Sequence, residues 1–230
     1  MLDTLFNSCI ENGSDIICSI IETAGVIAAA GIGIGGLKKV AKDRFDTYFT
    51  NFSSKNHNLE RIINRAEKEI MIIVTYGDNL LEEYKPLLVD RLEQGIKINF
   101  LMLNKEKARQ MTVDYYNDTD EKFRSCYKKS LEHLESLSRF TGFKVRMYEL
   151  PLSASYIAID CGIANHRRTR DALIQIMVYQ YMVKTPKAPI TYLSHRTPND
   201  ILESTIDSIR KMWSVAKEVV ISEYITEIEW

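Results

Sequence analysis

The residues with the clearest chemical potential lie close together, between positions 165 and 171. Three arginines and one histidine fall within this stretch: His166, Arg167, Arg168 and Arg170. Guanidinium groups carry paired N–H donors that match the oxygens of a phosphate. The stretch is therefore a candidate phosphate-binding loop. Contact with anionic lipid headgroups and an ordinary solvated basic turn are the alternative interpretations.

Other classes of chemistry have weaker support in the composition. The four cysteines are scattered, with no Cys-x-x-Cys pair and no Cys/His spacing that suggests zinc. The formal net charge of −1 gives no bulk argument for binding nucleic acid. We therefore expect no metal and no cofactor, and we do not expect direct binding of nucleic acid.

An apolar segment runs from Ile16 to Leu37 and contains one charged residue, Glu22. Its length of about twenty residues is what a helix needs to cross a bilayer. The residues before it are acidic, which argues against a cleaved signal peptide. Its glycines weaken a helix in water but are tolerated in a membrane. The sequence favours a transmembrane helix over residues 16–37, with a buried or interfacial segment as the alternative.

A basic cluster follows this segment directly, and it predicts the orientation. Lys38, Lys39, Lys42 and Arg44 lie within a few residues of its end. Positively charged residues stay on the cytoplasmic side of a membrane. We expect a single-pass protein of the bacterial inner membrane, with the N-terminus outside and the C-terminal domain in the cytoplasm.

One face of the predicted membrane helix combines small residues with the single carboxyl group. At helical spacing this face contains Glu22, Gly25, Ala29, Gly33 and Gly36. Small residues let helices approach closely, and a carboxyl group at membrane depth usually faces a bundle interior. The face predicts a homo-oligomeric bundle that could form a pore. A plain anchor is the alternative.

The rest of the chain predicts an α/β domain with a mixed sheet. The predicted organisation is a short N-terminal segment at 1–15, the membrane helix at 16–37, a linker helix at 38–52 and the domain at 53–230. Apolar runs predict strands at 69–76, 97–103, 144–150, 155–160, 173–183 and 190–194. Periodic segments predict helices near 59–66, at 79–93 ending at Gly95, at 117–140, and after a cap at Thr197. Strands alternate with helices first and then follow one another, which is typical of a sheet with a parallel and an antiparallel half.

The run from Arg65 to Asn104 resembles the opening of phospholipase D-like domains. In that family a helix leads to an apolar strand, then to a helix ending in a Leu-x-x-Gly-Ile-Lys-Ile pattern, and then to a second strand. The same pattern stands here at Leu92–Ile98. The resemblance implies a phospholipase D-like mixed-sheet domain over about residues 58–224, or one half-domain of that family.

The family's catalytic signature, His-x-Lys-x4-Asp, is degenerate in this chain. The resemblance aligns it with residues 153–160, where only Asp160 matches, while Ser153 replaces the histidine and Ser155 replaces the lysine. A serine cannot act as nucleophile and proton carrier without a base beside it. The resemblance therefore implies a domain without the family's phosphodiesterase activity. These three residues, with the basic loop, remain candidate ligand-binding residues, and a strand-end turn is the alternative role of Asp160.

Three functions are compatible with these features. The first is a membrane-anchored effector or sensor, by analogy with small proteins of bacterial and antiviral defence or stress response, in which the domain controls helix oligomerisation and membrane permeability. The second is a membrane-tethered phosphodiesterase or nuclease. The third is a Rossmann-like nucleotide-sensing module with its ligand at residues 75–79. The expected partners are the lipid bilayer, other copies of the chain, and a regulatory protein or nucleotide.

Overall fold

The chain divides into two units, residues Met1–Tyr48 and Phe49–Trp230. The computed structural model describes residues 50–51, 59–115, 117–163, 168, 171–179, 188–195, 197 and 199–228, all of which belong to the second unit. The predicted membrane helix and its Glu22 face lie outside the described residues. Among the helices that are described, none has the length and apolar character needed to cross a bilayer.

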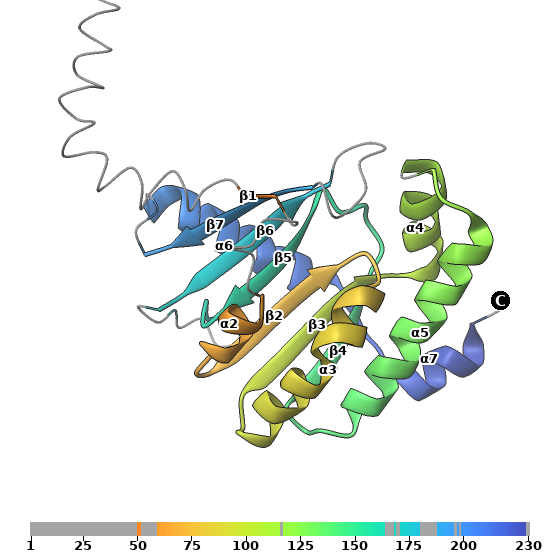
Figure 1. Ribbon diagram of the computed structural model, residues 1–230, viewed down its shortest axis with the longest axis horizontal. Coiled ribbons are helices and arrows are strands. Elements are labelled where there is room, and N and C mark those ends of the chain that lie inside the picture. Colours follow the sequence, from red (N-terminus) through yellow and green to blue (C-terminus); the bar gives the residue numbers. More distant parts are fainter. Residues whose placement is uncertain are drawn as a thin grey trace, which may run out of the picture. The chain divides into compact units, whose positions relative to one another are not determined.

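A mixed sheet forms the centre of the second unit (Figure 1). In the described residues it has eight strands in the order β1-β7-β6-β5-β2-β3-β4-β8. The strands are β1 (Thr50–Asn51), β2 (Glu69–Val74), β3 (Lys97–Leu103), β4 (Phe143–Tyr148), β5 (Ala154–Ile159), β6 (Leu173–Val178), β7 (Pro189–Ser194) and β8 (Lys217–Glu218).

The two halves of the sheet differ in strand direction. Strands β2, β3 and β4 are parallel, whereas β5 runs antiparallel to β2, and β6 and β7 continue the antiparallel order. The mixed α/β class predicted from the sequence is thus confirmed. Because β5 reverses direction beside β2, the start of β5 lies at the same edge of the sheet as the carboxyl ends of β2 and β3. We call this the carboxyl edge.

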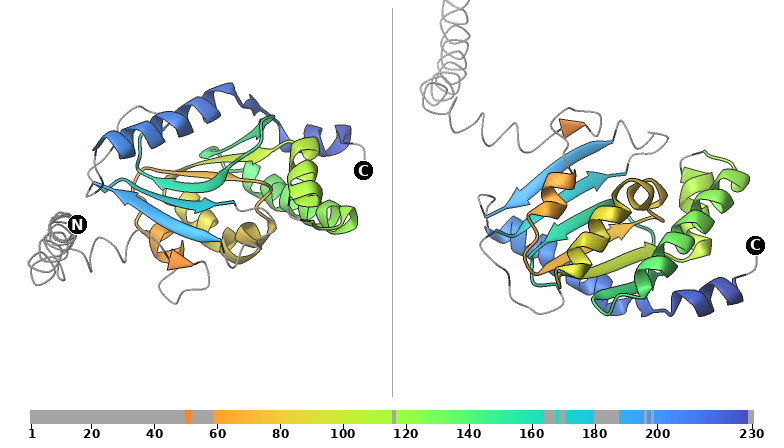
Figure 2. Two further views of the ribbon diagram at one scale, coloured as in Figure 1. Left: turned by 90° about the horizontal axis from the view of Figure 1, so that it is seen from above. Right: turned by 60° about the horizontal axis from the view of Figure 1, so that its bottom comes forward.

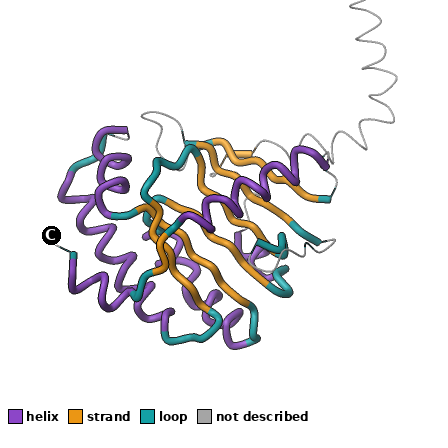
Figure 3. The backbone as a smooth tube through the Cα atoms, turned by 180° about the vertical axis from the view of Figure 1, so that it is seen from behind, coloured by secondary structure: helices purple, strands orange, loops and turns teal. Residues whose placement is uncertain are grey.

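Helices cover both faces of the sheet. They are α2 (Leu59–Asn64), α3 (Asp78–Glu93), α4 (Lys105–Gln110), the π-helix η1 (Met111–Tyr115), α5 (Asp120–Ser138), α6 (Asn199–Val215) and α7 (Ile221–Glu227). Figure 2 shows α2 and α3 on one face and α6 on the other. In the view from behind, α6 crosses in front of the strands (Figure 3). This cover explains why all six residues of β2 are buried.

A C-terminal capping motif ends α3, and a side-chain contact holds α6 against the sheet. At the end of α3, the Ile96 N–H donates to the Arg91 carbonyl at 3.0 Å and the Gly95 N–H donates to the Leu92 carbonyl at 2.9 Å. Gly95 has a φ of +82°, which is the left-handed conformation that this C-terminal motif requires. On the opposite face, Arg146 of β4 stacks on Trp213 of α6 at 4.5 Å and donates to the Trp213 carbonyl at 2.7 Å.

The structure differs from the sequence prediction in its short elements. Thr50 and Asn51, which the sequence pattern places in a linker helix, form the edge strand β1. Helix α4 and the π-helix η1 have no counterpart in the prediction. The final helix, which the sequence pattern extends to Val220, ends at Val215, and β8 and α7 follow it. The Thr197 hydroxyl accepts from the Ser194 N–H at 3.0 Å, so it closes the turn after β7.

Candidate functional site

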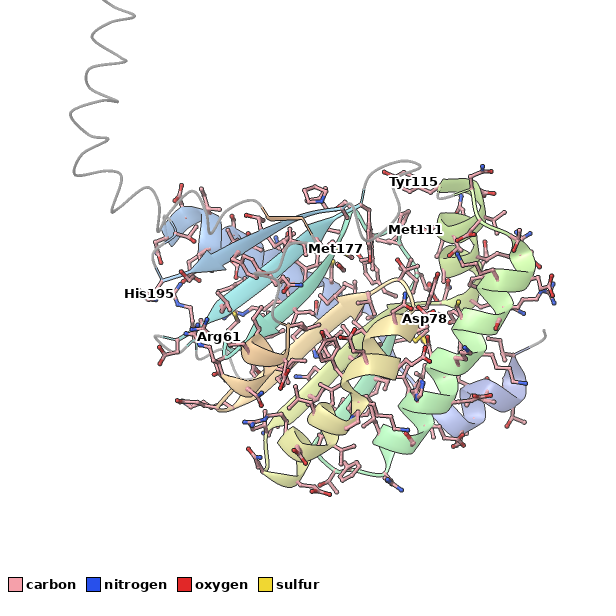
Figure 4. The ribbon with its side chains drawn as sticks, in the orientation of Figure 1. Arg61, Asp78, Met111, Tyr115, Met177 and His195 are labelled. Carbon is pink, nitrogen blue, oxygen red and sulfur yellow. The ribbon has the colours of Figure 1, made fainter. Side chains whose placement is uncertain are left out.

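A polar cluster occupies the carboxyl edge where β2 ends, β5 begins and β6 ends. It consists of Thr75 after β2, Ser153 and Ser155 at the start of β5, Tyr179 after β6, and Tyr115 at the end of η1. We call these residues the Tyr179 cluster. Figure 4 shows Tyr115 and Met177 of β6 at this edge of the molecule. The antiparallel pairing of β5 with both neighbours places these segments together although they are far apart in the sequence.

Tyr179 is the centre of the cluster. Its hydroxyl accepts a hydrogen bond from the Thr75 hydroxyl at 3.2 Å and is also hydrogen-bonded to the Ser155 side chain. Its backbone N–H donates to the Ser153 carbonyl at 3.0 Å, and its carbonyl accepts from the Tyr115 hydroxyl at 3.4 Å. Burial raises the pKa of Tyr179 above its usual value. The phenol is therefore a neutral side chain that occupies the space between the two strand ends.

The chemistry available to the two serines follows from these contacts. Ser155 is 7% exposed, and its partner in the cluster is the Tyr179 phenol. A neutral phenol does not accept a proton from serine at neutral pH, so it cannot activate the hydroxyl as a nucleophile. Ser153 takes part through its backbone carbonyl. The cluster can hold a ligand by hydroxyl groups, but its described contacts supply no general base.

Asp160 has a different role, at the opposite end of β5. Its carboxylate accepts hydrogen bonds from three successive backbone N–H groups, those of Glu67 at 2.9 Å, Lys68 at 2.8 Å and Glu69 at 3.1 Å. The residue is 1% exposed and has a φ of +54°. Asp160 therefore ends β5 in a tight turn and fixes the segment that leads into β2.

The structure separates residues that the family signature groups together. Ser155 and Asp160 lie at opposite ends of β5, about 16 Å apart at the usual rise of an extended strand. A single ligand the size of a phosphate cannot contact both. The candidate set of Ser153, Ser155 and Asp160 is thus divided between the Tyr179 cluster and the turn before β2.

Arg168, a described residue of the basic loop, lies beside helix α6. Arg168 forms an ion pair with Glu203 of α6 at 2.5 Å and also donates to the Asn199 side chain at 3.3 and 3.4 Å. These contacts hold the guanidinium against α6. His166, Arg167 and Arg170 lie outside the described residues.

In the loop proposed for nucleotide binding, residues 75–79, the side chains of Tyr76 and Asp78 contact η1 and α5. Tyr76 is hydrogen-bonded to Thr112, and its ring meets Phe123 edge-on at 6.3 Å between centroids. Asp78 is hydrogen-bonded to the Cys126 thiol, whose pKa is raised to about 11, first by burial and then by this bond. Tyr76 and Asp78 therefore hold η1 and α5 against the sheet.

A shallow pocket lies beside the Tyr179 cluster. It has a volume of about 200 Å³. Its lining residues are Lys107, Gln110, Met111, Asp114, Tyr115 and Pro151. Tyr115 belongs to both the pocket and the cluster, and Leu150 beside Pro151 is 57% exposed. In the part of the chain that the structure describes, no group of three or more metal-ligating side chains could hold a metal ion.

Sequence reasoning misses the central residue of this site. The apolar pattern assigns Tyr179 to strand packing, and its partners Thr75 and Ser155 lie 104 and 24 positions away. No local motif links such positions. The order of strands β2, β5 and β6 brings them together, and that order could not be read from the apolar pattern.

No protein-family model matches the chain, and no curated protein matches its sequence. Solved structures similar to it include TrmBL2, an archaeal chromatin protein described as showing a novel mode of DNA binding. The identity is 9%, over 93% of this chain and 69% of that chain, with a TM-score of 0.45.

Another similar structure is phosphatidylserine synthase from Haemophilus influenzae Rd KW20, a member of the phospholipase D-like superfamily. The identity is 13%, over 76% of this chain and 40% of that chain, with a TM-score of 0.44. The chain thus spans less than half the length of the synthase. Both TM-scores are below 0.5.

Proposed function

We propose that this protein is a membrane-anchored effector or sensor in which a degenerate phospholipase D-like domain controls oligomerisation of the helix at residues 16–37. A role in bacterial defence or stress response is part of the proposal, by analogy with small tethered proteins. The domain lies in the cytoplasm and acts on the membrane helix instead of on a substrate. Its input is a regulatory protein or a nucleotide.

The observation that carries this proposal is the Tyr179 cluster. The positions aligned with the family's catalytic histidine and lysine are Ser153 and Ser155, and they contact Tyr179, a neutral phenol. Asp160, the one residue that matches the signature, accepts three backbone hydrogen bonds. Its presence is therefore explained by the fold and does not call for catalysis.

If the domain performs no chemistry, the membrane segment is where function is expected. The face formed by Glu22, Gly25, Ala29, Gly33 and Gly36 suits close contact between copies of one helix. A ring of carboxyl groups at membrane depth would favour water over lipid. We propose that assembly through this face raises membrane permeability.

The test compares two leucine substitutions at the same depth in the membrane. Gly33→Leu adds bulk to the small-residue face, whereas Ile34→Leu changes a residue on the opposite face with little change in volume. Each full-length variant is expressed in bacterial cells with a potential-sensitive dye, and the mass of the detergent-solubilised complex is measured. We expect Gly33→Leu to lose both the oligomer and the depolarisation, while Ile34→Leu retains both. An unchanged oligomer and unchanged depolarisation in Gly33→Leu would contradict the bundle.

An activity assay on the detergent-solubilised protein distinguishes the enzyme hypothesis from the effector proposal. The detergent-solubilised full chain is incubated with DNA, RNA and phospholipid, and we expect no turnover. Cleavage that disappears in Ser155→Ala would instead favour a phosphodiesterase. Asp160→Ala is unsuitable for this assay because its effect on folding would also abolish activity.

A further inference from the structure

We call the part of the chain before the domain, residues 1–48, the tether. The first described element after it is the edge strand β1. Thr50 and Asn51 pair antiparallel with Ile190 and Pro189 at the start of β7. Strand β1 is the outermost strand on this side of the described sheet, and the unit that precedes it ends at Tyr48. The pairing of β1 with β7 is therefore the described contact nearest to the point where the chain enters the second unit.

A single row of paired residues connects β1 to the Tyr179 cluster. Thr50 lies opposite Ile190, Ile190 lies opposite Met177 in β6, and Met177 lies opposite Ser155 in β5. At the usual spacing between strands the row is about 14 Å long. Ser155 is hydrogen-bonded to the Tyr179 hydroxyl. The tether thus joins the sheet at the carboxyl edge, in register with the cluster.

The pairing of β1 is weak enough to be reversible. The strand has two residues, and one of the two residues opposite it is a proline, which has no N–H to donate to the ladder. Short edge segments with few hydrogen bonds open with the smallest free energies in a protein. For an element that opens this readily, a small change in free energy is enough to shift the balance between paired and unpaired states.

We propose that β1 is a strap whose pairing with β7 depends on the position of Tyr179 in the cluster, and that this pairing controls the tether. When Tyr179 is hydrogen-bonded to Thr75 and Ser155, the row of paired residues is ordered and β1 stays paired with β7. When an occupant or a substitution displaces Tyr179, β1 leaves β7 and the preceding segment is released to assemble. This inference rests on the proposed function for its output, but the coupling within the domain can be tested without it.

The coupling is tested by amide hydrogen exchange on the detergent-solubilised full chain. Tyr179→Phe removes the hydroxyl from the cluster, and Ser155→Ala removes one partner from the β5 side. In both variants we expect exchange in a peptide covering residues 49–52 to become about fivefold faster, the factor given by loss of one hydrogen bond. The matched control is Tyr148→Phe, at the end of β4 on the same edge. It should leave this peptide unchanged.

A disulfide between strap and sheet tests the output. Residues directly opposite in an antiparallel pair are close enough for a disulfide, so Thr50→Cys with Ile190→Cys locks β1 in place. Because the reducing cytoplasm would break this disulfide, the readout uses purified full-length protein in lipid vesicles. We expect Tyr179→Phe to dissipate the vesicle membrane potential more than the wild type. The oxidised double cysteine should abolish depolarisation in that background, and reduction should restore it.

The outcomes separate the two proposals. Unchanged exchange at residues 49–52 in both cluster variants would overturn the strap, whatever the membrane assay shows. Depolarisation by the oxidised cross-linked form would also overturn it. Faster exchange in a protein that never depolarises cells would support the strap while contradicting the proposed function.

Discussion

Asp160 joins two segments that are 91 to 93 positions apart in the sequence. Its carboxylate accepts the N–H groups of residues 67–69, and its own N–H donates to the Glu69 carbonyl at 3.0 Å. Glu69 in turn accepts from the Ile163 N–H at 2.6 Å. The exchange of hydrogen bonds in both directions makes this pair of buried carboxylates a fixed point between the two halves of the sheet.

Replacing Asp160 tests this role. Asp160→Asn keeps one acceptor oxygen and tolerates the positive φ, but it loses the charge and an acceptor. We expect the free energy of unfolding, measured by urea denaturation, to fall by about 2 kcal/mol. The control is Asp171→Asn at an exposed position, which should change it by less than about 0.5 kcal/mol. Equal stability of Asp160→Asn and the wild type would contradict this role for the carboxylate.

For single residues, the sequence predicts which residues are structurally important better than it predicts what they contact. It singles out Asp160, Ser155 and Arg168, and the structure gives each of them contacts that a linear motif does not contain. The Asp160 donors come from the loop before β2, and the Arg168 partner is on α6. Tyr179 is missed because aromatic residues on strands usually pack in the core, and nothing in the sequence distinguishes a hydroxyl that bridges two strand ends.

At the scale of elements, the turn from β2 into α3 depends on Gly77. Its φ is +78°, and a Cβ there would lie 2.9 Å from Val74 Cγ2 and 3.1 Å from Phe100 Cζ. Gly95, after α3, has a φ of +82°, but a Cβ there would have no neighbouring atom within 4 Å. The two glycines therefore share the backbone conformation and differ in crowding.

This difference predicts two distinct alanine effects. Gly95→Ala should lower the free energy of unfolding by about 1 kcal/mol, the cost of a left-handed alanine. Gly77→Ala should lower it by about 2 to 4 kcal/mol, because it adds a clash in a packed core. Urea denaturation of both variants gives the comparison. Equal losses would mean that Val74 and Phe100 move aside without cost.

The long elements could be predicted and the short ones could not. Strand β3 has the predicted bounds, Lys97–Leu103, because an unbroken apolar run of this length is typical of a strand buried on both faces. Helix α4 has six residues, of which Ala108 is buried, so it has no periodic apolar face. The strand order that creates the Tyr179 cluster depends on long-range pairing, which local patterns do not encode.

At the scale of the whole molecule, the domain buries many hydroxyl and thiol groups in their neutral form. Burial raises the pKa of Cys161 to about 12, and it also raises the pKa values of Tyr76, Tyr127 and Tyr179. Each of these groups releases its proton at lower pH in the unfolded chain than in the folded one. The unfolded state therefore gains stability as pH rises above the ordinary thiol value of 9.0.

We therefore expect the domain to lose stability in alkali. Cys161 alone should lower the free energy of unfolding by about 2 kcal/mol between pH 9 and pH 10.5. Urea denaturation at pH 7, 9 and 10.5 measures the change. The variant Cys161→Ala should show a shallower decline over the same range. A free energy of unfolding that stays constant up to pH 10.5 would mean that these groups ionise without unfolding.

The exchange between Asp160 and the segment before β2 also affects how the chain is made. The N–H groups of residues 67–69 have no carboxylate partner until Asp160 has been synthesised, about 5 to 18 s later at usual translation rates. During that time β2, an entirely apolar run after Glu69, lacks its neighbour β5 as well. The nascent protein therefore exposes the β5-facing edge of an aggregation-prone strand for seconds, which makes it a natural client for a chaperone that binds extended apolar segments.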